Sequence, residues 1–243
     1  MSDKPTALRV LAALRKSAVG DTAVLIGSSG LFGFETSVPA LTEDIDVAIP
    51  EALAAESGSE IVSALLLAGF SHEAGTATFT DGQGITFDLL GHGDPASGDH
   101  IGEGGPLRIM VFEDLSRVVG LGRAVLHLPD GGFALTPAGF VVIKLLTERG
   151  HKGLKDKLQA LLVIAERSAD SVFSAEVVRL LSSVDPIRVD DALASAQEAF
   201  LGLGHNPAFA DAGAEGYGRC LPDVERGFVR LGELVVALTR ERG

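Results

Sequence analysis

VLIGSSGLFGFETSVPALTEDIDVAIP, residues 24–50, contains two predicted strands and the turn that follows the first of them. The first strand ends at Gly27-Ser28, a glycine-containing turn then opens a short helix, and the second strand begins with Asp44-Ile45-Asp46. In an extended strand, residues two apart point to the same face and lie about 6.6–7 Å apart. Asp44 and Asp46 are therefore predicted to project together from one face of a sheet.

A third acid, Asp88, lies in the middle of the apolar run ITFDLL at 85–90. A carboxylate is costly in such a strand unless water or a cation reaches it. Carboxylates that share one face repel one another, and a hard divalent cation between their oxygens removes that repulsion. Asp44, Asp46 and Asp88 are therefore candidate ligands of Mg²⁺ or Mn²⁺. The alternative is a strand edge whose acids are solvated.

Short β-rich runs occupy residues 21–135 and predict one mixed sheet. The predicted strands are 22–27, 44–49, 76–80, 85–90, 107–112 and 124–128. Pro50 opens a helical pattern that should cover one face of this sheet and stop at Gly69. Residues 91–106 are rich in Gly, Pro and Asp, so we predict a mobile surface loop there.

From Thr136 onward the sequence has helical periodicity, which begins with an N-cap threonine followed by Pro137. We predict an α/β (α+β) fold with two domains, 1–135 and 136–243. The last helices are predicted at 174–184, 189–201 and 222–241, with a linker at 202–218.

Composition limits the class of protein. The 243 residues carry 20 basic and 33 acidic side chains, a net charge of −13, which argues against non-specific nucleic-acid binding. Basic residues gather in one stretch: Lys144, Arg149, Lys152, Lys155 and Lys157. The single cysteine, Cys220, excludes an internal disulfide and favours a structural thiol in a cytoplasmic protein. The amphipathic amino terminus and the short apolar runs predict no membrane segment.

Other chemistry-bearing residues form weaker patterns. His92, Asp94, Asp99 and His100 lie in the predicted loop without ligand spacing and are interpreted as solvated. The remaining histidines are scattered, and the sequence has no GxSxG, P-loop or GxGxxG motif. Lys144 on an apolar helix either extends to water or reaches a ligand, and Lys155-Asp156 is interpreted first as a helix-surface pair.

Gly27-Ser28, then Thr42-Glu43-Asp44-Ile45-Asp46, then Asp88 resemble the nucleotidyltransferase superfamily with a DNA polymerase β-like fold. The similarity is to the bacterial branch related to AbiEii-type toxins, and it extends over residues 22–165 through Lys144, Arg149 and Lys155-Asp156. The chain departs from the pattern in three places. The interval between Ser28 and Asp44 is longer than usual, no basic residue precedes Thr42, and the second acid often seen after Lys155-Asp156 is missing.

The resemblance implies transfer of a nucleoside monophosphate from a nucleoside triphosphate to a hydroxyl of a protein, a small molecule or an RNA end. Asp44, Asp46 and Asp88 would hold two Mg²⁺ or Mn²⁺ ions and act as the catalytic residues. The turn residues Gly27, Ser28 and Ser29, with Lys144, Lys152 and Lys155, would bind the nucleotide. A toxin-like role would also imply a cognate antitoxin as partner. The alternative is a non-catalytic module that binds a nucleotide or a partner on a degenerate fold of this kind.

Overall fold

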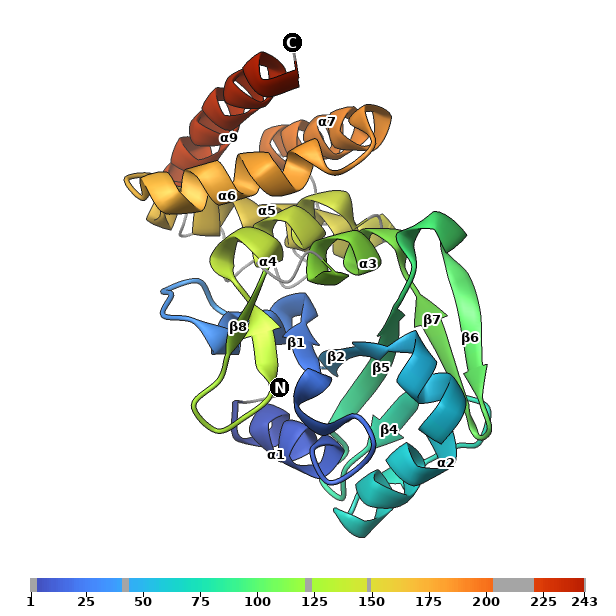
Figure 1. The fold of residues 1–243 in the computed structure, drawn as a ribbon. Coiled ribbons are helices and arrows are strands. Elements are labelled where there is room, and N and C mark those ends of the chain that lie inside the picture. The colour runs from blue at the N-terminus through green and yellow to red at the C-terminus, as the bar shows by residue number, and fades with distance from the viewer. Residues whose placement is uncertain (1–3, 41–43, 121–123, 148–149, 203–220, 243) are drawn as a thin grey trace. The chain divides into compact units, whose positions relative to one another are not determined.

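The computed structural model describes residues 4–40, 44–120, 124–147, 150–202 and 221–242. The chain divides into two compact units: Met1–Phe34 with Thr42–Thr136, and Glu35–Leu41 with Pro137–Gly243. The long part of the second unit begins at Pro137, one residue after the predicted start at Thr136, and residues 35–41 belong to this unit as well. The first unit combines a mixed sheet with helices, and the second contains helices, so the fold is α+β (Figure 1).

The described strands of the first unit form one sheet in the order β3-β4-β5-β2-β1-β9-β8, with β7 beside β5 and β6 beside β7. The central pair β2–β5 is parallel, and β1 and β4 flank it in antiparallel orientation. The strand bounds are β1 Val24–Ile26, β2 Asp44–Pro50, β3 Ser71–His72, β4 Thr78–Thr80, β5 Thr86–His92, β6 His100–Gly104, β7 Leu107–Val111, β8 Val125–His127 and β9 Phe133–Leu135.

The two faces of the sheet differ in chemistry because side chains alternate along each strand. Apolar residues of β2 and β5, such as Ile45, Val47 and Phe87, are fully or almost fully buried in the main hydrophobic core. Helices α1 (Lys4–Leu14) and α2 (Glu51–Leu67) contribute to the same core. Asp44, Asp46 and Asp88 alternate with these core residues and therefore lie on the other face.

Most predicted elements of the first unit are confirmed, and one prediction is wrong. Residues 91–106 are not a loop, because they contain the end of β5, a 3-10 turn η3 (Pro95–Ser97) and the strand β6. The glycines that suggested a loop instead permit close packing: a Cβ on Gly104 would meet the backbone oxygen of Ala54 in α2 at 1.7 Å. The strand β6 therefore lies against α2 (Figure 1).

Short segments complete the first unit. Three 3-10 turns and one further helix are described: η1 Gly20–Thr22, η2 Gly27–Gly33, η3 and α3 Glu113–Gly120. The turn η2 begins directly after β1, as the glycine-serine turn predicted. Because β1 pairs with β2, the turn η2 lies next to β2.

The second unit contains α4 Pro137–Leu146, α5 Gly150–Glu166, α6 Ser171–Ser182, α7 Pro186–Gly202 and α9 Leu221–Arg242. The predicted start at Thr136-Pro137 and the three later helices are confirmed with shifts of a few residues at their ends. Apolar residues on α5 and α9, among them Leu161 and Val224, are fully buried. Most of the predicted linker at 202–218 and Cys220 lie outside the described residues. Within the described part of the chain, no helix is long and apolar enough to span a bilayer.

Candidate metal centre

The parallel pairing of β2 and β5 brings three predicted carboxylates together. Asp46 stands directly opposite Asp88 in the register, and Asp44 stands two residues before Asp46 on the same strand and opposite Thr86. Neighbouring strands are about 4.8 Å apart, so Asp46 and Asp88 are side by side. One carboxylate oxygen from each of the three acids lies within 4.8 Å of the others. Asp46 is buried, whereas Asp44 and Asp88 are half-buried.

The donor set fits a hard divalent cation. Carboxylate oxygens are the protein ligands of Mg²⁺, and two oxygens on opposite sides of an octahedral Mg²⁺ are about 4.2 Å apart. The spacing of up to 4.8 Å is slightly longer than this, so the side chains must move together by a few tenths of an ångström to share one ion. The chain has no Lys or Arg between residues 17 and 107, so the segment that builds this site supplies no permanent cation of its own. The sequence prediction of Asp44, Asp46 and Asp88 as neighbouring candidate ligands therefore agrees with the geometry.

Gly27 gives the Asp46 carboxylate its space. The residue has φ +57°, a left-handed conformation that favours glycine, and a Cβ built on it would lie 1.9 Å from the Asp46 Oδ2. Any larger residue at position 27 would displace the carboxylate as well as strain the backbone. The sequence assigned Gly27 to nucleotide binding, and the structure gives it a second function in forming the acidic site.

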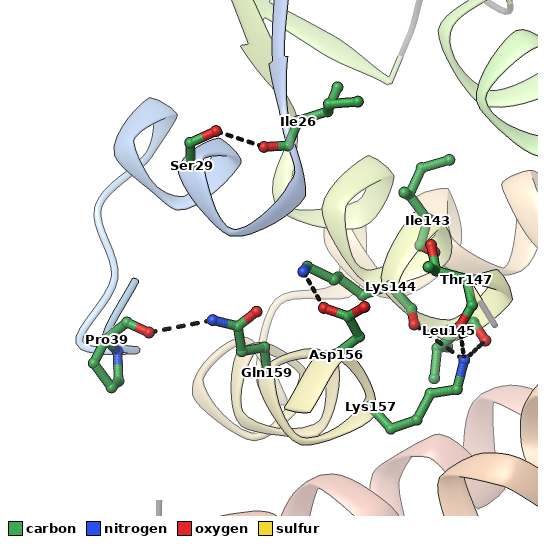
Figure 2. A network of polar contacts seen from close by, with 10 residues as sticks. All are labelled: Ile26, Ser29, Pro39, Ile143, Lys144, Leu145, Thr147, Asp156, Lys157 and Gln159. Carbon is green, nitrogen blue, oxygen red and sulfur yellow. Dashed lines mark hydrogen bonds and ion pairs between the residues drawn. The ribbon is translucent and has the colours of Figure 1, made fainter. Parts of the chain in front are cut away.

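Both serines of the turn are buried, and the hydroxyl of Ser29 bonds to the backbone of the protein. The Ser29 hydroxyl donates to the backbone carbonyl of Ile26 at 2.7 Å (Figure 2). It also lies 3.2 Å from the backbone carbonyl of Asp46. Its one proton thus joins the end of β1 to β2, and the structure does not support the expected contact of this hydroxyl with a phosphate. Ser28 is buried and begins η2 with Gly27. Its predicted contact with a phosphate stays a prediction.

Thr78 is a site residue that the sequence analysis missed. It stands opposite Asp88 in the antiparallel β4–β5 pair, and its hydroxyl donates to the Asp88 Oδ1 at 2.5 Å. The signal in the sequence was weak, because a threonine in the run TATFT at 76–80 is what any strand favours. Only the strand register identifies it as the neighbour of a carboxylate.

Asp81, in the same unit, is a buried acid that is paired with an arginine of the protein. Its Oδ2 accepts from Arg9 Nη2 at 2.5 Å, and its Oδ1 accepts from the backbone N–H groups of Gln83 and Ile85. Burial raises the pKa of this carboxyl, but the two backbone donors and Arg9 outweigh burial and hold the pKa below its usual value. A buried acid with such partners needs no metal.

The four residues of the predicted loop form no metal site among the described residues. Asp94 caps η3, and the Asp99 carboxylate accepts from the backbone N–H of Glu113. His100 Nε2 lies 2.8 Å from Glu51 Oε1, and the backbone carbonyl of Gly98 together with Glu51 raises the pKa of His100. These residues are therefore not simply solvated, as the sequence suggested.

His92 occupies the end of β5, where its Nε2 is buried without a hydrogen-bond partner. Burial lowers the pKa of His92 to about 4, because the charged imidazolium loses its hydration there. The imidazole is consequently neutral at physiological pH, four residues along the strand from Asp88.

Lys144 of the second unit does not extend to water. The residue is 5% exposed, and its ammonium donates a hydrogen bond to Asp156 Oδ1 (Figure 2). This contact joins α4 to the first turns of α5. Asp156 is also 5% exposed, so the interpretation of Lys155-Asp156 as an ordinary surface pair is wrong for the aspartate. Two opposite charges that are buried together satisfy each other.

Lys157 is buried as well, and the sequence analysis counted it only as part of a basic stretch. Its ammonium donates to the backbone carbonyls of Lys144, Leu145 and Thr147 at the C-terminal end of α4, the bond to Thr147 being 2.7 Å long (Figure 2). The last carbonyls of a helix have no partner within the helix, and a lysine there supplies both hydrogen bonds and favourable charge.

The basic stretch is therefore not one solvated patch. Of its five cationic residues, Lys144 and Lys157 are buried and bonded to groups within the second unit, and Lys155 is half-buried. Arg149 and the side chain of Lys152 lie outside the described residues. The expected nucleotide contacts of Lys152 and Lys155 stay predictions.

The long interval between Ser28 and Asp44 has a structural explanation. Residues 35–41, which lie inside it, belong to the second unit, and hydrogen bonds join Thr36, Ser37 and Pro39 to α5. Glu166 accepts from the Thr36 hydroxyl at 2.7 Å and from the Ser37 backbone N–H, and Gln159 Nε2 donates to the Pro39 carbonyl at 3.3 Å. These contacts lie within the second unit, so part of the interval between Ser28 and Asp44 packs on α5.

Comparison with known proteins adds no assignment, because no family model and no curated protein sequence matches the chain.

Proposed function

We propose that the first unit is a polymerase β-like nucleotidyltransferase domain and that the chain transfers a nucleoside monophosphate from a nucleoside triphosphate to a hydroxyl acceptor. The observation that carries the proposal is the convergence of Asp44, Asp46 and Asp88 from two adjacent parallel strands, beside a glycine that leaves room for the central carboxylate. The segment 17–107, which carries all three acids, contains no Lys or Arg, and this fits a cation bound there.

The residues divide the chemistry between them. Asp44 and Asp46 hold divalent cations, and Asp88 completes the site on the acceptor side. When bound, Mg²⁺ or Mn²⁺ neutralises the triphosphate and lowers the pKa of the attacking hydroxyl. The acceptor oxygen forms a bond to the α-phosphorus, the bond from that phosphorus to the bridging oxygen breaks, and pyrophosphate leaves. The acceptor's proton passes to Asp88, which acts as the general base.

The acceptor is a hydroxyl of a protein, a small molecule or an RNA end. The net charge of −13 and the 91-residue segment without Lys or Arg, 17–107, weigh against a long polyanion. A toxin-like role with a cognate antitoxin rests on the sequence resemblance alone.

A second candidate is a non-catalytic module that binds a nucleotide or a partner on a degenerate fold of this kind. Two observations favour it: the Ser29 hydroxyl is bonded to the Ile26 carbonyl, and the Lys144 ammonium is paired with Asp156. Both groups were expected to contact phosphates, and both have partners inside the protein.

The test is to incubate the chain with Mg²⁺ or Mn²⁺ and each α-phosphate-labelled nucleoside triphosphate, with total RNA and with cell extract as acceptors. Label should move to an acceptor with the native chain and not with Asp44→Asn/Asp46→Asn. Digestion of the labelled product with ribonuclease or protease identifies the acceptor class. Nucleotide binding that depends on metal but transfers no label would support a nucleotide-binding module. Absence of both binding and transfer would contradict the transferase and leave a module that binds a partner.

A further inference from the structure

Thr78 lies outside the acidic triad, and its side chain forms a hydrogen bond with the triad residue Asp88. It lies on β4, directly opposite Asp88, and its hydroxyl is 2.5 Å from the Asp88 Oδ1. A carboxylate in a strand otherwise rotates about its terminal bond with little cost, because that torsion is broad. The hydroxyl proton fixes the rotation of this one.

The direction of the bond matters for a metal site. A threonine hydroxyl has one proton to donate, and an ionised aspartate only accepts. With Oδ1 held by Thr78, the plane of the carboxylate is set and the direction of Oδ2 is set with it. Partners of this kind orient metal ligands in proteins, and their loss commonly weakens metal binding by about 10–100-fold.

We infer that Thr78 is a positioning residue that orients Asp88 for divalent-cation binding. This inference rests on the proposed function, since it takes Asp88 as a ligand. Thr78 itself contacts neither metal nor substrate and acts only through the carboxylate. The residue is exposed, so removing its hydroxyl leaves the hydrophobic core unchanged.

The strand provides a matched control. Thr80 lies two residues further along β4, on the same face, and stands opposite Thr86 instead of an acid. Thr78→Val and Thr80→Val make the same change of a hydroxyl to a methyl group, with the β-branched shape preserved. Only the first removes a donor from the carboxylate. Thr78→Ser keeps that donor.

The experiment is a calorimetric titration of the full chain with Mn²⁺, together with a melting temperature for each variant without metal. We expect Thr78→Val to bind Mn²⁺ about tenfold more weakly than the native chain. Thr78→Ser and Thr80→Val should remain within about twofold, and all melting temperatures should agree within a few degrees. Thr78→Ala is a second variant without the hydroxyl and should show the same loss as Thr78→Val.

Three results would overturn the inference, and they are distinguishable. Native Mn²⁺ affinity in both Thr78→Val and Thr78→Ala would remove the role of Thr78 and leave the proposed function intact. Equal weakening by Thr80→Val would show a general disturbance of β4. Absence of saturable Mn²⁺ binding by the native chain would contradict the proposed function and this inference with it.

Discussion

The acidic site of the first unit and the Lys144–Asp156 pair of the second unit treat charge in opposite ways. On β2 and β5, three carboxylates have ligand oxygens within 4.8 Å of one another. Between α4 and α5, one ammonium and one carboxylate are buried as a pair. The first arrangement gathers like charge, which costs free energy in the absence of a cation, and the second balances charge inside the fold.

This difference separates a binding site from a structural contact. The sequence predicted a metal site for the acids in the strands. It left open whether Lys144 in its apolar helix extends to water or reaches a ligand. The structure shows that Lys144 has an internal partner and that the three carboxylates of the triad lie close together. We propose that a bound cation balances the charge of the triad. Whether a charged side chain has an oppositely charged neighbour therefore separates binding sites from structural contacts better than how unusual the residue is at its position.

The largest expected effect comes from breaking the Lys144–Asp156 ion pair of the second unit. Asp156→Ala leaves the Lys144 ammonium buried without this carboxylate, and removal of one partner of a buried pair typically costs about 3–5 kcal/mol of unfolding free energy. Denaturant unfolding measures the loss. The double variant Lys144→Met/Asp156→Leu is the control, and it should recover most of the stability because neither charge of the pair remains.

The next largest effect is the pH dependence of stability that His92 of the first unit causes. The pKa of His92 is about 4 in the folded protein and about 6.5 in an unfolded chain, so the unfolded chain binds the proton first as pH falls. The stability that neutral His92 provides is complete above pH 6.5 and is lost as pH falls toward 4, by at most about 3 kcal/mol. Unfolding free energies measured between pH 7 and 4 should show this slope.

His92→Gln should flatten that part of the profile, since glutamine does not titrate. The raised pKa of His100 acts in the opposite direction: its contribution is complete below pH 6.5 and is lost as pH rises through the raised value. An unchanged slope in His92→Gln would show that another group controls the acid side.

Two glycines with nearly the same backbone conformation test the packing of the acidic site. Gly27 (φ +57°) leaves a Cβ only 1.9 Å from the Asp46 Oδ2, whereas Gly20 (φ +56°) has no atom within 4 Å of a Cβ. Alanine at either position costs about 1 kcal/mol for the left-handed conformation. Gly27→Ala should cost about 1–2 kcal/mol more than Gly20→Ala, because it must also displace a carboxylate.

Metal binding should separate the same two variants. Gly27→Ala should lose Mn²⁺ affinity and Gly20→Ala should keep it, in the same titration that measures the native chain. Equal affinity in both variants would mean that Asp46 does not need its observed position.

The smallest expected effect concerns the like charges themselves. In a buffer with chelator, Asp88→Asn removes one of three neighbouring negative charges and keeps an oxygen that accepts from Thr78. The melting temperature should stay equal or rise slightly, corresponding to about 0.2–1 kcal/mol. The contrast with Asp156→Ala is the point of the measurement: removing an acid relieves one region and damages the other. A clear loss of stability in Asp88→Asn would contradict the repulsion argument.

The sequence predicted the acidic site well because period-two alternation fixes which side chains share a face. Asp44 and Asp46 follow from one strand alone, and Asp88 from its position among apolar residues. Thr78 could not be predicted, because its proximity to Asp88 depends on which strands pair and in which register. The strand β6 was missed for a related reason, since glycines that allow close packing against α2 look like loop residues in a sequence.

The basic residues of the second unit were the least predictable part. A run of lysines reads as a solvated patch, and only helix packing shows that Lys144 pairs with Asp156 while Lys157 caps α4. The docking of residues 35–41 on α5 likewise depends on contacts more than 115 positions apart in the chain. Such contacts are set by tertiary structure and leave no local pattern.

The central claim is that Asp44, Asp46 and Asp88 together bind a divalent cation. Crystals of the chain grown with Mn²⁺ and a nucleoside triphosphate, measured at a wavelength where manganese scatters anomalously, test it most directly. The account predicts an anomalous peak about 2 Å from a carboxylate oxygen of each of the three acids, absent in Asp46→Asn. A fully occupied peak elsewhere, or none at the triad, would contradict it.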